Sequence, residues 1–287
     1  HLSIRRQRQM CIRDRYEDIL ENRATMAKVL IKELQSYKKQ YAVPRKTLID
    51  NLEEAVVEEK KIEEMDVVFL MDRFGYAKTV DVSVYERNKE AADTENRYIL
   101  TCKNTDKICI FTNKGQMHLL KVLDLPYGKF RDKGIPIDNL SNYNSSEENF
   151  IYIINLGAII HSRLLFGTKT AMLKMVDGSE FDVAKRTTAS TKLNEDDELL
   201  IVHAMTGEET VVMQSEKEMF LRIEASTIPE KKKGAVGVRG MKLNAGDALS
   251  NIYVLDGESE QTVEVKGKEV VLNRLRVGNR DTKGTKR

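Results

Sequence analysis

The first part of the chain has the apolar spacing of a helix. Between Tyr16 and Tyr41, apolar residues recur every three or four positions, and charged residues fill the positions between them. This spacing places the apolar residues on one stripe of an α-helix of about seven turns. Pro44 disfavours helical geometry in the residue before it. The sequence therefore predicts one long helix over residues 16–44, followed by a linker over residues 45–66.

Short apolar runs rich in β-branched residues follow the linker. Each run is four to seven residues long and is bounded by turn residues, a pattern typical of β-strands. The runs are Val67–Met71, Ile108–Phe111, Met117–Val122, Phe150–Ile154, Ala171–Val176, Leu199–Val202, Thr210–Met213 and Val263–Val265. Residues 67–287 are therefore predicted to be mainly β.

A strand–turn–strand unit recurs through this β region. The turns centre on Gly75, Gly115, Thr170, Lys217 and Gly267, which lie 40, 55, 47 and 50 residues apart. Most units are followed by a second segment that combines glycine with basic residues. Such periods, with about four strands each, are typical of radially repeated blades rather than of a stacked sandwich. We predict a propeller-like domain of about five four-stranded blades.

Composition is that of a folded protein without a membrane span. The chain has 287 residues, of which 41% are hydrophobic and 32% charged. Its apolar runs are far shorter than the roughly 20 residues of a membrane helix. Three cysteines cannot form a disulfide framework, which favours a reducing compartment, so the cytoplasm is expected. Four scattered histidines without a CxxC motif predict no metal site.

The first fifteen residues differ from the rest. They lack an initiator Met and show no periodicity, and Met10–Arg15 resembles translated adapter DNA from sequencing libraries. We expect residues 1–15 to be an artefact of that kind and exclude them from the fold prediction. A natural basic arm is the alternative.

Charge is unevenly distributed along the chain. The net charge is only +2, but residues 53–66 hold seven acidic residues against two basic ones. Residues 261–287 hold eight basic residues against three acidic ones. A basic end favours an anionic partner such as nucleic acid, and a solvated surface is the alternative.

Several short motifs follow one another in a fixed order. They are Glu33–Tyr41, Pro44–Thr47, Phe111–Gly115, Leu125–Pro126, Gly134–Ile137 and Gly237–Leu243. Together they resemble the C-terminal region of the A subunit of bacterial type IIA DNA topoisomerases, which are gyrase and topoisomerase IV. The resemblance extends from about Tyr16 to the end of the chain. It implies a helix that leaves the coiled coil of the cleavage core, followed by a DNA-binding β-pinwheel that bends or guides the transported duplex.

The blade edges supply the candidate DNA-binding residues. A belt of Lys and Arg would hold phosphates without reading bases, and its attraction would offset a bending cost of about 1–6 kcal/mol for 20–30 base pairs. The candidates are Lys114, Arg131, Lys133, Lys185, Arg186, Lys192, Lys231, Lys232, Lys233, Arg239, Lys242, Arg274, Arg276, Arg280 and Lys283.

The first blade favours topoisomerase IV over gyrase. Gyrase A subunits carry a Gln-Arg-Arg-Gly-Gly-Lys-Gly box there, which wraps DNA. The matching region, Tyr85–Thr94, has no glycine pair and mixes acidic with basic residues. Close approach of phosphates to such a backbone is unfavourable. We therefore expect relaxation and decatenation, and a gyrase without its box is the alternative.

No catalytic residue is assigned. The family cleaves DNA with a Tyr that follows an Arg, but Arg15-Tyr16 opens a predicted helix at the suspected adapter junction. No cofactor is expected in this fragment, because in this family ATP and Mg belong to the partner B subunit. The resemblance also implies an A-subunit homodimer formed by upstream residues. Two other hypotheses stay open: a propeller-like protein-interaction scaffold, and an enzyme with a site of its own.

Overall fold

The computed structural model describes residues 2–44, 46–47 and 63–287. The chain divides into two compact units, His1–Lys60 and Lys61–Arg287, and each is described by itself. Most of the predicted linker, residues 45–66, lies outside the described residues. Within the described part, no helix is both long enough and apolar enough to cross a membrane.

The first unit contains two helices, α1 (Leu2–Glu21) and α2 (Arg23–Tyr41), where one long helix over residues 16–44 was predicted. Asn22 separates them: its backbone is extended (φ −108°, ψ 105°), and its side chain accepts a hydrogen bond from Ala24 N. Asparagine is a weak helix former and a good N-cap, so this one residue ends α1 and starts α2. Residues 2–15 belong to α1, and their foreign origin stays a prediction.

The predicted apolar stripe extends from the end of α1 over α2 and is largely exposed. No described residue of α2 is buried. The exposed apolar residues are Leu30, Ile31, Leu34, Tyr37 and Tyr41. The helix ends at Tyr41, ahead of Pro44, as the sequence predicts.

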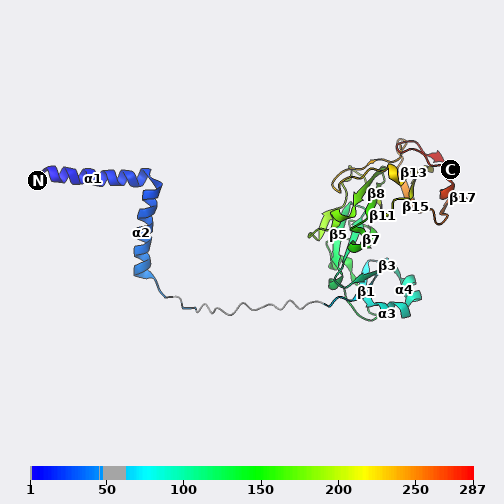
Figure 1. The fold of residues 1–287 in the computed structure, drawn as a ribbon, viewed down its shortest axis with the longest axis horizontal. Coiled ribbons are helices and arrows are strands. Elements are labelled where there is room, and N and C mark those ends of the chain that lie inside the picture. The colour runs from blue at the N-terminus through cyan, green and yellow to red at the C-terminus, as the bar shows by residue number, and fades with distance from the viewer. Residues whose placement is uncertain (1, 45, 48–62) are drawn as a thin grey trace. The chain divides into compact units, whose positions relative to one another are not determined.

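The second unit consists of five antiparallel sheets that follow one another along an arc (Figure 1), named blades 1 to 5 in chain order. In blade 1 the strand order is β3 (Asn96–Lys103), β1 (Asp66–Asp72), β2 (Tyr76–Asp81) and β6 (Ile135–Pro136). In blade 2 it is β10 (Thr187–Ala189), β5 (Gln116–Lys121), β4 (Lys107–Thr112) and β7 (Phe150–Asn155). In blade 3 it is β11 (Leu199–Met205), β8 (Arg163–Thr168), β9 (Met172–Asp177) and β14 (Val238–Arg239). In blade 4 it is β15 (Leu249–Leu255), β12 (Thr210–Ser215), β13 (Met219–Glu224) and β18 (Thr285–Lys286). Blade 5 pairs β16 (Thr262–Val265) with β17 (Lys268–Val271). The predicted mainly β, blade-repeat fold is confirmed, with two strands in the fifth blade.

Short helices connect the strands. They are α3 (Val82–Arg87), α4 (Lys89–Glu95), α5 (Leu156–Ile159) and the 3₁₀ turns η1 (Val122–Asp124), η2 (Ile137–Asn139), η3 (Gly178–Phe181), η4 (Ala225–Thr227) and η5 (Leu272–Arg274). The pair α3–α4 covers the face of blade 1 that no other blade covers, where Val68 and Leu70 pack with Ala92. This pair occupies the Tyr85–Thr94 region that lacks the wrapping box.

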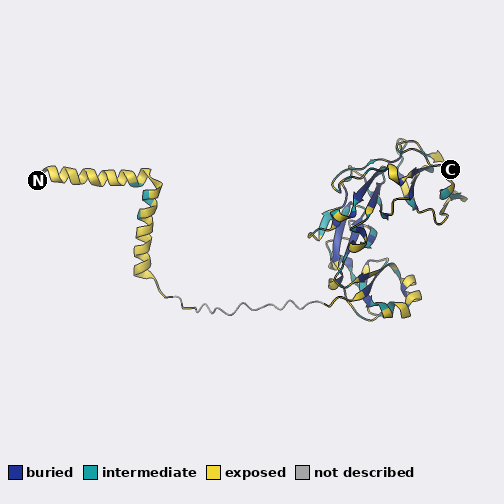
Figure 2. Ribbon diagram, viewed as in Figure 1, coloured by how far each residue is buried: buried dark blue, intermediate teal, exposed yellow. Residues whose placement is uncertain are grey.

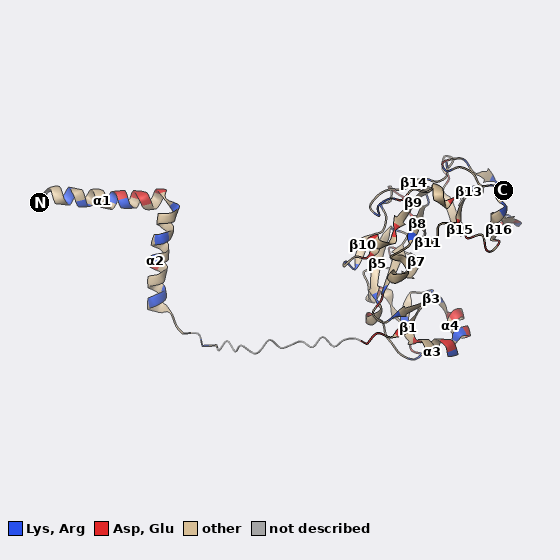
Figure 3. Ribbon diagram, viewed as in Figure 1, with Lys and Arg blue, Asp and Glu red and all other residues tan. Residues whose placement is uncertain are grey.

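Each four-stranded blade is completed by a strand from farther along the chain. Four strands leave the region of one blade and pair at the edge of the previous blade, and we call them exchange strands. They are β6 in blade 1, β10 in blade 2, β14 in blade 3 and β18 in blade 4. At the opposite edges, β7 contacts both β3 and β11, and β11 contacts β15. These contacts place β3, β7, β11 and β15 on the inner side of the arc. The exchange strands therefore form the outer rim, where Figure 3 shows β10 and β14.

The blades pack face to face, so their central strands are buried on both sides (Figure 2). In β8, Leu164 and Phe166 belong to the core between blades 2 and 3, whereas Leu165 belongs to the core between blades 3 and 4. Alternate side chains of one strand point to opposite faces. This is why the strands have continuous apolar runs in the sequence rather than an alternating pattern.

The glycine before an exchange strand lets two backbones approach closely. A Cβ at Gly134 would lie 2.8 Å from Ala77 O, and a Cβ at Gly237 would lie 2.5 Å from Leu173 O. Both distances are shorter than any ordinary carbon–oxygen contact. A side chain at either position would therefore push the exchange strand away from its blade.

Candidate nucleic-acid interface

Three loops of equal length cross the outer rim immediately before exchange strands. We call them loop 1 (127–134), loop 3 (230–237) and loop 4 (277–284), after the blade that each one closes. Each begins at a parallel bridge to its blade: Tyr127 to Thr79, Glu230 to Met175 and Val277 to Arg222. Each ends on the glycine before the exchange strand. Blade 2 has a shorter connection, residues 182–186, which we call loop 2.

These four loops carry most of the predicted DNA-binding residues. The residues are Arg131 and Lys133 in loop 1, Lys185 and Arg186 in loop 2, Lys231, Lys232 and Lys233 in loop 3, and Arg280 and Lys283 in loop 4. The fold thus brings residues far apart in the sequence to equivalent places along one rim. Lys129 of loop 1 is a further exposed cation there, which the sequence analysis did not select.

Lys78 of β2 holds loop 1 against blade 1 through the backbone carbonyls of the loop. Its ammonium donates hydrogen bonds to Phe130 O at 2.5 Å and Asp132 O at 3.0 Å. It also lies 5.0 Å from the centroid of the Phe130 ring, a cation–π distance. Phe130 in turn packs against the apolar cluster under α3 and α4. Arg131 and Lys133 are left exposed on the outside of this anchored loop.

Loop 3 is fixed in the same way by Lys174 of β9. Although it is a lysine, its side chain is only 1% exposed. Its Nζ donates to Lys233 O and Ala235 O, both at 2.8 Å, and to Lys232 O at 3.2 Å. Burial lowers the pKa of Lys174 to about 8. The sequence shows this residue only as a lysine inside an apolar run, and neither Lys174 nor Lys78 was selected from it.

Glu180 also anchors loop 3. Its carboxylate accepts a hydrogen bond from Lys233 N at 3.0 Å and lies 3.3 Å from Lys232 Nζ. Lys233 Nζ donates to Glu180 O at 2.7 Å, so this side chain points back toward the blade. Among the predicted cations of loop 3, Lys232 is exposed although it pairs with Glu180, and Lys231 is partly buried.

Loop 4 is tied to the exchange strand of the neighbouring blade. Asp281 lies 3.5 Å from the guanidinium of Arg239, and Arg280 donates to Arg239 O at 2.9 Å. Lys242 N donates to Thr282 O at 2.9 Å. Four predicted residues, Arg239, Lys242, Arg280 and Lys283, therefore gather where blades 3 and 4 meet on the rim.

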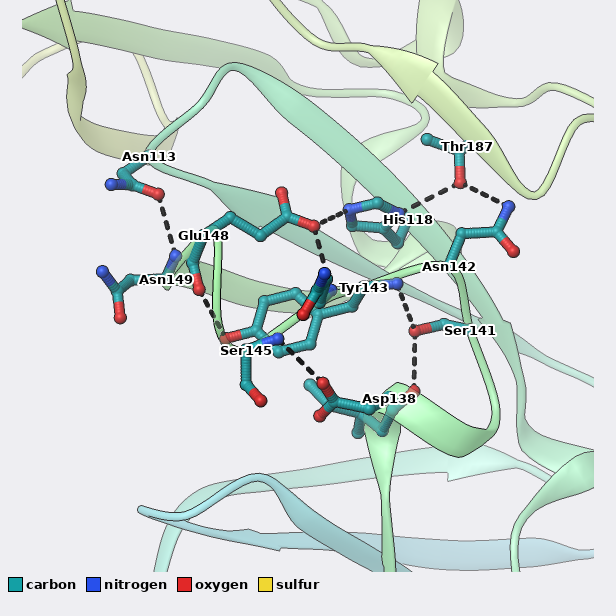
Figure 4. Close-up of polar contacts among 12 residues, drawn as sticks. Asn113, His118, Asp138, Ser141, Asn142, Tyr143, Ser145, Glu148, Asn149 and Thr187 are labelled. Carbon is teal, nitrogen blue, oxygen red and sulfur yellow. Dashed lines mark hydrogen bonds and ion pairs between the residues drawn. The ribbon is translucent and has the colours of Figure 1, made fainter.

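Blade 2 holds its exchange strand by a side-chain network instead of a glycine (Figure 4). His118 is buried, with its Nδ1 3.0 Å from Thr187 Oγ1 and its Nε2 2.7 Å from Glu148 Oε1. Asn142 donates to the same Thr187 hydroxyl at 2.9 Å. Arg186 stands where the other blades have glycine, and its carbonyl accepts from Leu119 N at 2.7 Å.

Some predicted residues lie outside the rim loops. Lys114 is in the β4–β5 turn, where its ammonium lies 2.9 Å from Glu198 Oε1. Hydrogen bonds from Lys169 and Lys114 lower the pKa of Glu198 to about 2. Lys114 thus shares one carboxylate with Lys169, so its charge is only partly compensated. Arg274 precedes loop 4 and pairs with Glu260 at 3.3 Å.

Lys192 and Arg276 are exposed, and they have no ion pair with any residue that the structure describes. Lys192 follows β10, and Arg276 directly precedes loop 4. Both therefore lie beside the rim loops rather than within them.

A cavity of about 780 Å³ lies between α4 and loop 1. Tyr76, Phe130, Arg131 and Lys133 contribute to its walls together with Glu95. In the described part of the chain, no three His, Cys, Asp or Glu side chains are grouped closely enough to hold a metal ion. The notable chemistry of the described residues is therefore the row of cations on the rim, which suits a polyanion held by its phosphates.

Comparison with a family of known proteins agrees with the fold. Residues 162–203 and 209–256, which cover most of blades 3 and 4, match the family described as "DNA gyrase C-terminal domain, beta-propeller". Both matched segments lie within the second unit. Curated relatives of the chain include the DNA gyrase A protein of Lawsonia intracellularis, 28% identical over 94% of this chain and 35% of the relative. The DNA gyrase A protein of Staphylococcus epidermidis is 29% identical over 94% of this chain and 32% of the relative. The chain thus spans about a third of the length of these relatives.

Solved structures share the pinwheel fold. The C-terminal domain of DNA topoisomerase IV matches 78% of this chain and 73% of its own with a TM-score of 0.70 at 22% identity. The E. coli ParC C-terminal domain matches 77% of this chain and 94% of its own with a TM-score of 0.63 at 15% identity. A DNA gyrase A C-terminal domain matches 77% of this chain and 76% of its own with a TM-score of 0.52 at 17% identity. At these identities the likeness establishes the fold.

Proposed function

We propose that this chain is the DNA-binding C-terminal part of the A subunit of a type IIA DNA topoisomerase. The observation that carries the proposal is the repetition of cation-bearing loops at equivalent places on the pinwheel rim. A duplex that follows this rim meets one loop after another, and each loop offers ammonium or guanidinium groups to phosphates. Contacts of this kind favour a bent duplex without reading its sequence. The bend would guide the transported duplex during relaxation and decatenation.

The complete enzyme would need parts that this chain does not supply. We expect a B subunit to bind ATP and Mg, and a second A subunit to form the homodimer. The chain would act in the cytoplasm, where the chromosome is. None of its own residues is assigned a catalytic role.

Within this family we place the chain with topoisomerase IV. Support comes from blade 1, where the helices α3 and α4 stand in place of a glycine-rich wrapping loop. The curated relatives are gyrase A proteins, so a gyrase without its box is the alternative. The two alternatives can be distinguished by treating relaxed plasmid with the chain and a type I topoisomerase and then measuring its linking number. Bending without wrapping leaves the linking number unchanged, whereas a shift in linking number supports the gyrase alternative.

DNA binding itself is tested by salt titration of fluorescence anisotropy with a duplex of about 30 base pairs. The affinity should fall steeply with salt, and the slope of log K against log salt should decrease by about 0.9 for each phosphate contact removed. The triple variant Lys231→Gln, Lys232→Gln, Lys283→Gln removes rim charges. The triple variant Lys103→Gln, Lys217→Gln, Lys266→Gln removes equal charge elsewhere.

Two results decide the test. A loss of slope in the rim variant alone supports the proposal. Weak binding with little salt dependence would contradict it and favour the protein-interaction scaffold.

A further inference from the structure

We propose that Lys78 and Lys174 are positioning residues for DNA binding, which hold loops 1 and 3 from inside the blades so that the loop cations face outward. The inference rests on the proposed DNA-binding function. Neither lysine reaches the rim itself: each ammonium is turned inward, toward carbonyl oxygens of its own loop.

The two lysines occupy the same place in different blades. Lys78 follows Ala77, which pairs with Ile135 of the exchange strand β6. Lys174 follows Leu173, which pairs with Val238 of the exchange strand β14. Each lysine is thus the residue next to the first exchange-strand pair of its blade.

The carbonyls that they hold also correspond. Counting back from the closing glycine, Lys78 binds the carbonyls four and two residues earlier, which are Phe130 O and Asp132 O. Lys174 binds the carbonyls at the same two positions, Lys233 O and Ala235 O. The same two lysine–carbonyl hydrogen bonds thus occur in two blades of different sequence, which indicates a shared role rather than a chance contact. We call a loop held in this way a caged loop.

The other two blades show what replaces the lysine. The equivalent residues are Leu119 in blade 2 and Leu221 in blade 4, as strand pairing requires. Blade 2 has no eight-residue loop to hold, and loop 4 is held by Arg239 and Asp281 instead. An apolar residue therefore suits this buried place, and lysine is found in the two blades whose long basic loop is bound through its backbone carbonyls, although Glu180 also ties loop 3.

A caged loop binds phosphate better than a free one. Fixing the carbonyls inward removes backbone freedom that DNA binding would otherwise have to remove, so less entropy is lost on association. Burying an ammonium is costly unless it is hydrogen-bonded, and three carbonyl oxygens of loop 3 accept from Lys174. Without the ammonium those carbonyls lose their donor, so the effect of its removal falls first on loop 3.

The test is a double-mutant cycle in the full chain. Lys174→Met keeps side-chain length and removes the ammonium, and Lys231→Gln with Lys232→Gln removes two positive charges from loop 3. We expect Lys174→Met alone to weaken binding of a duplex of about 30 base pairs by about three- to tenfold at low salt. In the background without the loop 3 charges, the same substitution should change binding less than about twofold, because coupled residues are not additive.

Controls separate positioning from general damage. Lys217→Met removes a lysine that donates to Ala245 O away from the rim loops, and it should not affect DNA binding. If Lys174→Met fails to fold, the cycle of Lys78→Met with Arg131→Gln and Lys133→Gln tests the same proposal in blade 1. Unchanged binding, or an equal loss in both backgrounds, would overturn the inference. Absence of salt-dependent DNA binding by the unmodified chain would instead overturn the proposed function.

Discussion

Replacing Gly237 by alanine should displace the exchange strand β14 from its place in blade 3. The new Cβ would lie 2.5 Å from Leu173 O and 2.8 Å from Leu173 C, whereas ordinary contacts begin near 3.4 Å. The strand must therefore move by most of an ångström, and the movement weakens the hydrogen bond of 2.7 Å from Gly240 N to Ala171 O. Overpacking costs about 1–3 kcal/mol and each weakened hydrogen bond about 0.5–1.5 kcal/mol. We expect the free energy of unfolding to fall by about 2–4 kcal/mol.

Urea unfolding followed by circular dichroism measures this loss, and loop 3 supplies the control. Gly234 lies three residues earlier, and a Cβ there would have no heavy atom within 4 Å. Gly234→Ala should therefore change stability by less than about 1 kcal/mol, and in the stabilising direction. If the two alanine variants unfold at the same urea concentration, close backbone approach does not explain the glycine and the strand-exchange argument is refuted.

Three further predictions concern single groups. Burial raises the pKa of Glu209, but hydrogen bonds from Thr206 and Gly207 outweigh it and lower the pKa to about 2. The stability that Glu209 contributes is thus present above about pH 4.5 and lost as the pH falls toward 2. Glu209→Gln should cost about 1–2 kcal/mol at pH 7 and nothing near pH 2, and exposed Glu208→Gln is the control; a loss independent of pH would contradict this. Burial raises the pKa of Cys109 to about 12 and that of Cys102 to about 11, whereas Cys11 is exposed. A thiol reagent should therefore modify one cysteine in the folded chain and three in denaturant; modification of all three in the folded chain would disprove the burial. Lys114→Gln should change DNA affinity less than Lys283→Gln in anisotropy titrations, because Glu198 holds the Lys114 ammonium, whereas Lys283 has no ion pair with a described residue; equal losses would place Lys114 on the DNA path.

Blade repetition could be predicted from the sequence because it depends on short-range patterns. Strands buried on both faces leave continuous apolar runs, and each hairpin turn marks its own position. The recurring glycine-and-basic segments were also visible, and they begin where loops 1, 3 and 4 end.

The exchange of strands could not be predicted in the same way. The strands β6, β14 and β18 have two residues each, too few to show a period, and their partners lie 58 to 67 residues back in the chain. The break at Asn22 was missed because the apolar spacing continues across it, whereas the cap depends on one side-chain hydrogen bond.

The candidate site was predicted in its composition rather than its geometry. Lys and Arg residues near predicted glycine turns included the rim cations. They also included Lys114, whose partner Glu198 lies 84 residues away in the sequence. It missed Lys78 and Lys174, because a lysine in an apolar strand gives no sign of which carbonyls it will bind. Those contacts exist only once the exchange strands have set the path of each loop.

Hydrogen–deuterium exchange with and without a duplex of about 30 base pairs tests the central claim most directly. If the outer rim grips DNA, amides in loops 1 to 4, residues 127–134, 182–186, 230–237 and 277–284, should exchange more slowly in the complex. The inner strands β3, β7, β11 and β15 should be unaffected. Protection confined to those inner strands or to the hairpin turns, with the four loops unchanged, would contradict the account.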